Sequence, residues 1–463
     1  MNADQSQTAI GVDDAAELER RTMRKVRRRI VPLMMLIYLI AYLDRNNVGF
    51  AKAGMAADLG LSDAAYGFGA GIFFLGYVLL ETPSNAGMYR FGARRWIARI
   101  LVSWGIMACA MALVRGETSF YVIRALLGVA EAGFFPAVLF YFTLWFPPQQ
   151  RVAALGLFVM VQPLANALGA PLSGLLLNLD GLGGWHGWQW MYLLEGLPAV
   201  IMGVLAPRLI TDRPSQATWL KPDERAWLVR TMDAEAAAKG AVGPHGFRAG
   251  MKDPRAWIYG ALCFGMVCGI YGLGLWLPTI VKGMGEYSNS SSTVLGLLVM
   301  IPYAVSLPFV YYWARRAART GQRAVHASIS LGLGAVGLLG AGYLLSASPV
   351  VALAFLSLGA AGIYSSIGPM LSMPSALFAG AAAAAGLGVM NSFGNAGGFF
   401  APYLVGIIKD QTHSDQFALT FLAACLAVTG VCTYLYAARR PEGDGRIEAA
   451  LIEAAARQRA LSG

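Results

Sequence analysis

Apolar runs alternate with short polar segments along nearly the whole chain. A helix needs roughly 20 residues to cross about 30 Å of hydrocarbon, and twelve of the runs are long enough. They lie near residues 30–49, 66–86, 96–114, 119–142, 152–176, 188–207, 256–281, 293–313, 324–346, 350–378, 384–408 and 416–437. The pattern predicts an all-α membrane protein with twelve transmembrane helices. Because the number is even, both chain ends should lie on the same side.

The longest polar connection lies between the sixth and seventh runs. Pro222, Asp223 and Glu224 in this connection are typical of the first turn of a surface helix. We therefore predict two six-helix bundles joined by a linker. The predicted parts are a cytoplasmic tail 1–29, a bundle 30–207, a cytoplasmic linker 208–254, a bundle 255–437 and a cytoplasmic tail 438–463.

Composition and charge agree with this interpretation. Of all residues 57% are hydrophobic and 13% are charged, and the net charge is +10. Most Lys and Arg lie in the tails, the linker and the loops on the same side, and the opposite loops contain Lys52, Arg115, Lys282 and Lys409. The positive-inside rule then predicts cytoplasmic tails, in a bacterial inner membrane. Topology and lipid headgroups account for the basic charge, so no nucleic-acid partner is expected.

Cysteine and histidine usage argues against a metal site or a redox site. The five cysteines lie in apolar runs without CxxC spacing, and the four histidines lie in loops or at a helix end. We expect no metal and no cofactor, so a proton carrier inside the membrane must be a carboxylate. An enzyme would need a nucleophile with its base, or a metal cluster, at membrane depth. A receptor or channel should lack duplicated halves and paired carboxylates.

Several charged residues fall inside the predicted helices. A charge at a helix centre costs about 2.5–3.5 kcal/mol even on insertion scales, so each needs a partner or a function. The candidates are Asp44, Arg45, Glu81, Arg99, Arg124, Glu131 and Glu195. Of these, Glu81, Arg99 and Glu195 lie nearer helix ends, where we favour a role in structure or gating.

Arg45 is the first candidate for binding a transported anion. It lies about 15 residues, or roughly 22 Å, from the start of the first run, near the middle of the membrane. Tyr38, Tyr42 and Arg45 share one helix face. A guanidinium binds a carboxylate through two parallel hydrogen bonds, and phenols can bind hydroxyl groups. Alternatively, Arg45 neutralises Asp44 or an acid of the fourth helix.

Asp44 and Glu131 are the candidate proton carriers. Asp44 points about 100° away from Arg45 around the helix axis, and Arg124 and Glu131 lie on one face of the fourth helix. Burial favours a neutral carboxyl and a nearby arginine favours a charged one, so these acids can change protonation as a cavity opens and closes. The alternative is a permanent structural network with Arg124.

The two halves resemble each other weakly in sequence. Placing Tyr42 on Tyr271 also aligns Gln162 with Asn391, and Asn166 with Asn395. Such a repeat is typical of secondary transporters with a site near the bilayer midplane. The second half offers hydroxyls and amides as ligands, which also hold transmembrane helices together. Its candidate substrate ligands are Tyr271, Ser372, Asn391 and Asn395.

Several motifs identify a family resemblance. The basic turn "GMYRFGARR", the stretch "RALLG" and the Gly/Pro-rich "NALGAPLSG" resemble the major facilitator superfamily. More narrowly, "YLDRNNVGFA", "FFLGYVLLETPSN", "RALLGVAEAGFFPA", "MYLLEGLPAV" and "WLKPDERAWL" resemble the anion:cation symporter family, and bacterial tartrate and phthalate permeases within it. The resemblance implies that Arg45 binds the substrate anion and that Asp44 and Glu131 are proton sites. Unlike the family pattern, the turn after the second helix has Tyr89 in place of an acid before Arg90.

Together these observations predict a proton-coupled symporter of an organic carboxylate, tartrate-like or a sugar acid, that works as a monomer by alternating access. The expected substrate ligands are Arg45, Tyr42, Tyr77, Gln162, Tyr271, Ser372, Asn391 and Asn395, and the expected proton-coupling residues are Asp44, Glu131 and Arg124. The alternatives are an uncoupled or exchange-type anion transporter and a symporter of aromatic carboxylates. Sodium coupling also remains open.

Overall fold

The computed structural model describes residues 3–240, 251–373 and 380–438, and it is helical almost throughout, with no strand in these ranges. The major helices are α1 (Ala3–Leu59), α2 (Asp63–Phe91), α3 (Ala93–Ala110), α4 (Glu117–Glu131), α5 (Phe134–Trp145), α6 (Pro148–Val159), α7 (Val161–Leu176), α8 (Gly187–Leu209), α9 (Pro222–Gly240), α11 (Pro254–Lys282), α12 (Ser292–Thr320), α13 (Arg323–Leu344), α14 (Pro349–Ser372), α15 (Gly380–Thr412) and α16 (Asp415–Thr433).

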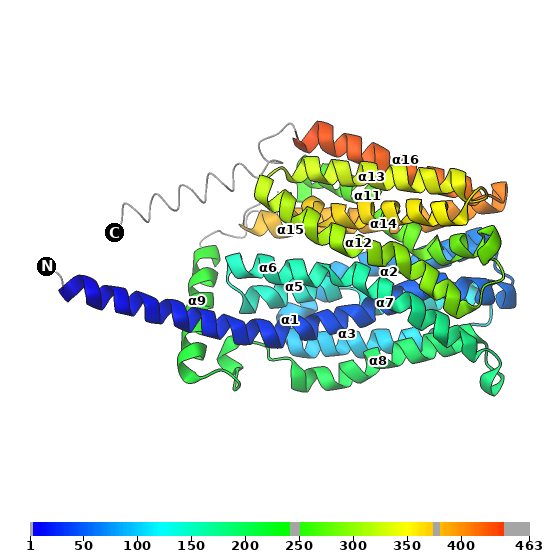
Figure 1. The fold of residues 1–463 in the computed structure, drawn as a ribbon. Helices are drawn as coiled ribbons and strands as arrows, with labels where there is room; N and C mark the ends of the chain where they lie inside the picture. The colour runs from blue at the N-terminus through cyan, green and yellow to red at the C-terminus, as the bar shows by residue number, and fades with distance from the viewer. Residues whose placement is uncertain (1–2, 241–250, 374–379, 439–463) are drawn as a thin grey trace.

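The long helices run side by side along the molecule (Figure 1). Ten segments of the described chain are long and apolar enough to cross a membrane; α4 with α5, and α6 with α7, each make one of them. The remaining two spans are α1, which carries the buried charges Asp44 and Arg45, and α15. The predicted all-α architecture with twelve transmembrane helices is confirmed.

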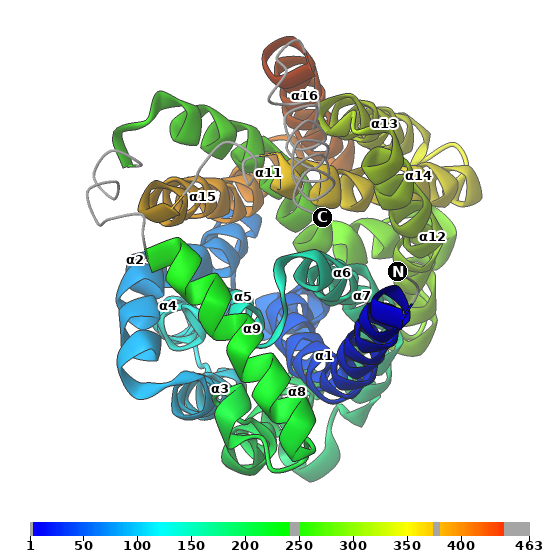
Figure 2. The same cartoon turned by 90° about the vertical axis from the view of Figure 1, so that its left-hand side faces the viewer.

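Helices α1–α8 gather on one side of the molecule and α11–α16 on the other (Figure 2). We call α1–α8 the N-terminal half and α11–α16 the C-terminal half. The end where α9 crosses and α1 begins is the linker face, and the end where α1 stops at Leu59 is the opposite face (Figure 1). The first helix is much longer than the predicted run 30–49, because it continues through the polar tail.

Local sequence signals account for the helix boundaries. The Ser62 hydroxyl accepts the N–H of Ala65 at 3.0 Å at the start of α2, and Asp253 caps α11 in the same way at 2.8 Å. Gly321, at a φ of 70°, ends α12 in a left-handed conformation. The acid missing from the turn after α2 has a substitute, because Asp212 accepts the N–H of Arg94 at 2.7 Å.

Two spans predicted as single runs are interrupted. The run 119–142 breaks at Gly133, which has a φ of 85°, and the run 152–176 breaks at Met160, between α6 and α7. Apolar periodicity does not reveal such breaks, because the residues on both sides stay apolar. Their effect is to place Glu131 at the end of α4 and Gln162 near the start of α7.

The two halves approach closely where glycines remove side chains. A Cβ on Gly174 of α7 would lie 2.4 Å from the Ser292 carbonyl oxygen, and one on Gly296 of α12 would lie 2.4 Å from that of Ala170. These paired glycines let α7 and α12 pack backbone against backbone. Of the predicted parts, residues 241–250 of the linker, 374–378 of the tenth run and 439–463 of the C-terminal tail lie outside the described residues.

Candidate functional site

Arg45 lies at the centre of the molecule, and its side chain is 10% exposed. One guanidinium nitrogen donates to the Tyr271 hydroxyl at 2.8 Å, and another forms an ion pair with Glu131. The guanidinium carbon also lies 5.1 Å from the ring centre of Phe73 and 5.5 Å from that of Tyr77. Aromatic faces stabilise a cation, so Arg45 lies in an aromatic cage with one carboxylate to balance its charge.

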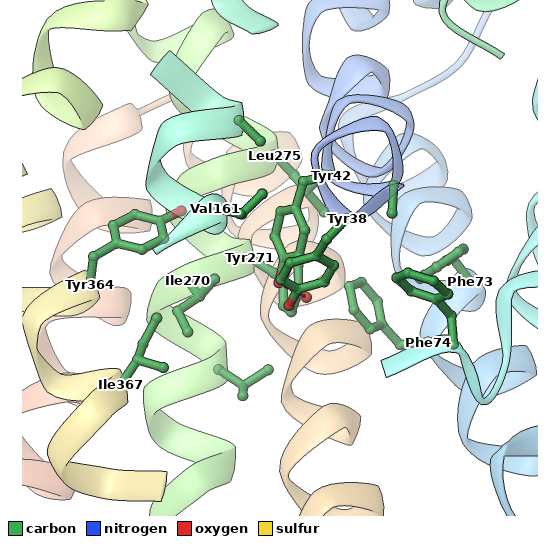
Figure 3. Close-up of a cluster of buried hydrophobic side chains, with 14 of the residues drawn as sticks. Tyr38, Tyr42, Phe73, Phe74, Val161, Ile270, Tyr271, Leu275, Tyr364 and Ile367 are labelled. Atoms are coloured by element: carbon green, nitrogen blue, oxygen red, sulfur yellow. Dashed lines mark hydrogen bonds between the residues drawn. The ribbon is translucent and has the colours of Figure 1, made fainter. Parts of the chain in front are cut away.

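Three tyrosines meet beside this cage, from both halves of the molecule (Figure 3). The hydroxyls of Tyr42 and Tyr271, equivalent positions in the sequence repeat, lie 3.3 Å apart. Tyr38 stands edge-on to Tyr42, and its hydroxyl accepts the Gln162 amide at 2.7 Å. Predicted ligands from α1, α7 and α11 therefore converge on one polar cluster.

Arg124 lies deeper in the N-terminal half and is fully buried. It donates to the carbonyl oxygens of Gly69 at 3.3 Å and Ala70 at 2.9 Å, and stacks on Phe73 at 5.1 Å. The sequence grouped Arg124 with Asp44 and Glu131, but here its hydrogen bonds go to the backbone of α2. Glu131, the last residue of α4, pairs with Arg45 instead.

Asp44 belongs to a different environment. One of its carboxyl oxygens accepts the indole N–H of Trp104 at 2.9 Å. Nearby, one carboxyl oxygen of Glu195 accepts the Ser173 hydroxyl at 2.7 Å. Glu195 is 3% exposed although its place in the sequence indicated a helix end. Within the described residues, no cluster of three or more histidines, cysteines or acids has the arrangement of a metal site.

The remaining predicted ligands are spread along the C-terminal half. The Asn391 amide donates to the Glu81 carboxylate and so joins α15 to α2. Asn395 lies one turn further along α15, half-buried. Ser372 is the last residue of α14, and its hydroxyl donates to the Pro369 carbonyl at 2.9 Å. The structure thus places Ser372 at a helix end, about 12 Å along α14 from Tyr364.

Several residues of the cluster were not predicted. Phe73 precedes Tyr77 by one helical turn, so the i, i+4 spacing could have revealed it. Asn166 was noted only as a repeat position, yet its amide donates to the Tyr364 hydroxyl of the other half at 2.7 Å. Trp104 gave no sequence signal, because a tryptophan in an apolar helix is ordinary.

A small pocket lies beside this cluster, between the two halves. Its polar lining comes from both halves, namely Tyr42, Asn46, Asn47, Asn166, Ser173 and Tyr303. Beyond it the halves are joined by Asp410, whose carboxylate accepts the N–H groups of Asp63 at 2.9 Å and Ala64 at 2.7 Å. The first turn of α2 is thus capped by the other half.

The sequence profile described as Major Facilitator Superfamily matches residues 34–402. The chain belongs to the major facilitator superfamily. It is 45% identical over 432 residues to a protein named putative tartrate transporter from Agrobacterium vitis, covering 93% of this chain and 98% of that one. It is 38% identical to a quinolone resistance transporter from Acinetobacter baumannii, covering 91% and 96%.

Solved structures of this superfamily share the fold. The xylose transporter XylE from E. coli, in a partially occluded inward-open conformation, aligns with a TM-score of 0.72 at 15% identity, covering 89% of this chain and 98% of that one. The predicted resemblance to tartrate-type permeases is confirmed by the relatives. The protein is a multi-pass membrane transporter of the major facilitator superfamily.

Proposed function

We propose that this protein is a proton-coupled symporter of an organic carboxylate. The observation that carries the proposal is the contact of Arg45 with Glu131 and with Tyr271 of the other half. Through this contact the proposed anion-binding group, Arg45, touches both the proposed proton-binding group, Glu131, and the boundary between the two halves, at Tyr271.

The Arg45–Glu131 pair links anion binding to protonation. In this structure the Glu131 carboxylate holds the guanidinium that a substrate carboxylate needs. A proton on Glu131 neutralises it and frees Arg45, which then forms two parallel hydrogen bonds to the substrate. Loss of the substrate restores the ion pair and releases the proton. Binding of the two ligands is therefore mutually favourable.

The other predicted residues complete the site. Tyr42, Tyr77, Gln162, Tyr271 and Asn391 shape the substrate pocket, and Asn395 extends it along α15. Asp44 carries a second proton, and Arg124 holds α2 and α4 in register for Glu131. The position of Ser372 at the end of α14 favours a role near the exit on the linker face over direct contact with bound substrate.

Two kinds of carboxylate fit the cluster. Hydroxyls and amides around Arg45 favour a hydroxylated acid, in keeping with the name of the tartrate-transporter relatives. The rings of Phe73 and Tyr77 beside the guanidinium favour an aromatic carboxylate as the second candidate. An uncoupled or exchange-type transporter is the alternative in mechanism.

Transport proceeds by rocking of the bundles 30–207 and 255–437 around the central site. The cap of Asp410 on α2 joins the two halves near the opposite face, and in this proposal it separates when that face opens. We place the linker face in the cytoplasm of a bacterial cell, with the protein as a monomer in the inner membrane. If more than one proton accompanies a monoanion, an inside-negative potential assists uptake.

Uptake into proteoliposomes tests the proposal. A panel of radiolabelled hydroxy acids, sugar acids and aromatic acids is offered with and without an imposed inward proton gradient. We expect accumulation of one class of acid above equilibrium only with the gradient. Accumulation that ignores the gradient, with counterflow intact, would assign an exchanger instead, and a matched sodium gradient distinguishes sodium coupling.

A further inference from the structure

Two buried carboxyls lie beside α1, away from the aromatic cage of Arg45. Asp44 of α1 is 2% exposed and Glu195 of α8 is 3% exposed. Each has one oxygen in a hydrogen bond, to Trp104 and to Ser173 respectively, and one oxygen, Asp44 Oδ1 or Glu195 Oε2, without a partner. In the described part of the chain, neither carboxyl forms an ion pair with a basic side chain.

Asn47 completes this group. It follows Asp44 by three residues and so lies on the same face of α1, and its amide lies next to the Glu195 carboxyl. In the described part of the chain, the amide lies within hydrogen-bonding reach of Glu195, but neither of its polar atoms forms a well-aligned hydrogen bond. One oxygen of each carboxyl and the amide of Asn47 therefore lack a well-aligned partner among the described residues. Such clusters are rare in native structures and call for a bound ion, a water or a proton.

The electrostatic cost of two buried carboxylates favours a bound proton. Two carboxylates without a cation in a water-poor interior would each lose several kcal/mol of solvation and would also repel each other. A proton on one of them removes the repulsion and one of the two desolvation costs, and it turns an acceptor into a donor. The Asn47 amide can then accept from the protonated acid and donate to the other with a small side-chain rotation.

We propose that Asp44, Asn47 and Glu195 form one proton-holding site, in which Glu195 is the partner acid of Asp44 and the pair carries one transported proton. This inference deepens the proposed symport and rests on it for the claim of transport. The chemical step is the formation of an O–H bond on one face of the membrane and its loss on the other. No other bond changes.

A small pocket adjoins this site. Asn47 and Ser173 line it together with Gly274 and Tyr303 of the other half. Because α1 runs toward the opposite face after Arg45, Asn47 lies on that side of the substrate cluster. When the halves part at that face, we expect water entering the pocket to reach Asn47 and Ser173 and so to carry protons to the acid pair.

The surrounding groups leave the acid pair as a separate unit. The other ionisable side chains that interact with it are Tyr192 of α8, Cys109 of α3 and Glu131 of α4. The nearest arginines, Arg45 and Arg124, interact with Glu131. Arg45 is already paired with Glu131, and Arg124 is bound to the α2 backbone. The protein thus has two acid sites, one coupled directly to the anion through Arg45 and one reached through the pocket.

Infrared spectroscopy of the purified protein in detergent tests the site without any transport assay. We expect a C=O band of a buried protonated carboxyl at neutral pH, lost in Glu195→Gln and in Asp44→Asn. Ser173→Ala removes the hydrogen bond to Glu195 and should shift the band without abolishing it. Glu117→Gln, at an exposed position, should leave it unchanged. A band that persists unaltered in folded Glu195→Gln and Asp44→Asn overturns the proposal.

Proteoliposomes test whether the proton is transported. Each coupled proton contributes about a tenfold accumulation ratio per unit of pH gradient, so Glu195→Gln should lower accumulation by roughly that factor while counterflow continues. Unchanged accumulation in Glu195→Gln, with wild type responding to the gradient, overturns coupling through Glu195. If wild type itself ignores the gradient, the proposed symport is wrong, and the infrared band still decides whether the acid pair holds a proton.

Discussion

The two halves share a fold but differ in their buried charges. Among the described residues, the N-terminal half buries Asp44, Arg45, Lys52, Glu81, Arg124, Glu131 and Glu195. The C-terminal half buries one Lys or Arg and no acid there, namely Lys409 in the last turn of α15, and it places hydroxyls and amides near the charged cluster. The two halves thus share a helical scaffold, while most of the buried charge lies in one of them.

The contact between the halves shows how a half with few buried charges can interact with the charged cluster of the other half. Tyr271 contacts both Arg45 and Tyr42, so the C-terminal half meets the charged cluster through a hydroxyl that carries no charge of its own. Breaking such a hydrogen bond costs about 0.5–3 kcal/mol, whereas breaking a buried ion pair costs about 3–5 kcal/mol. A moving boundary is therefore better placed between a charged half and one with few buried charges.

Changing the anion-binding charge should have the largest effect. Arg45→Lys keeps the positive charge but cannot form two parallel hydrogen bonds, and hydrogen bonds to charged groups contribute about 1.5–3 kcal/mol each. We expect substrate affinity to fall by roughly 100-fold, measured by calorimetry on the purified protein. Arg115→Lys, at an exposed position, is the matched control. Normal affinity in Arg45→Lys would remove Arg45 from the site.

Neutralising Glu131, the acid that pairs with Arg45, should affect uphill transport but not exchange. In Glu131→Gln the amide cannot gain or lose a proton, so we expect accumulation to fall by about tenfold per unit of pH gradient while counterflow exchange continues. Glu117→Gln, on the same helix but exposed, should behave like wild type. Intact accumulation in Glu131→Gln would show that Glu131 carries no coupled proton.

Removing the neutral contact from the other half should have a smaller effect. Tyr271→Phe deletes the hydroxyl that accepts from Arg45 at 2.8 Å but leaves both charges in place. We expect about a fivefold rise in KM for uptake, corresponding to about 1 kcal/mol. Tyr343→Phe, at a position that is 62% exposed, provides the comparison. A Tyr271→Phe effect as large as that of Arg45→Lys would contradict the division between the halves.

The smallest effect concerns the linker, which is bound to the charged half. Lys25 Nζ lies 2.8 Å from the buried Glu224 carboxylate, and Arg21 lies 2.9 Å away. Burial raises the pKa of Glu224. Hydrogen bonds from Lys25 and from the Lys221 N–H, together with the positive charges of Lys25 and Arg21, lower this pKa by more. The net result is a pKa below the ordinary value of a glutamate. The stabilisation is present above the unfolded pKa of about 4.3.

That stabilisation is therefore lost as pH falls through the lower pKa of the folded state. We expect faster proteolysis of the linker in acid, and in Glu224→Gln already at neutral pH, with wild-type-like transport rates. Glu17→Gln removes an exposed pair within α1 and should change neither. Equal protease resistance of Glu224→Gln and wild type at neutral pH would show that this contact does not hold the linker.

Some of this protein follows from its sequence alone. Apolar runs of sufficient length require membrane helices, because an unpaired backbone cannot enter hydrocarbon. Charges such as Arg45 inside those runs require partners or functions for a similar reason. The sequence thus predicted twelve helices, and it identified Arg45, Tyr42 and Tyr271, which the fold brings into contact.

Tertiary structure alone decided which charges pair. Helical angles separated Asp44 from Arg45 but could not show that Glu131 turns to Arg45 while Arg124 bonds to α2. These contacts join helices that are distant in the chain, so an apolar pattern does not reveal them. It also could not show Glu195 beside Asp44, because α1 and α8 are far apart in the chain. Electrostatic partners depend on distances of a few ångströms between helices, which only packing determines.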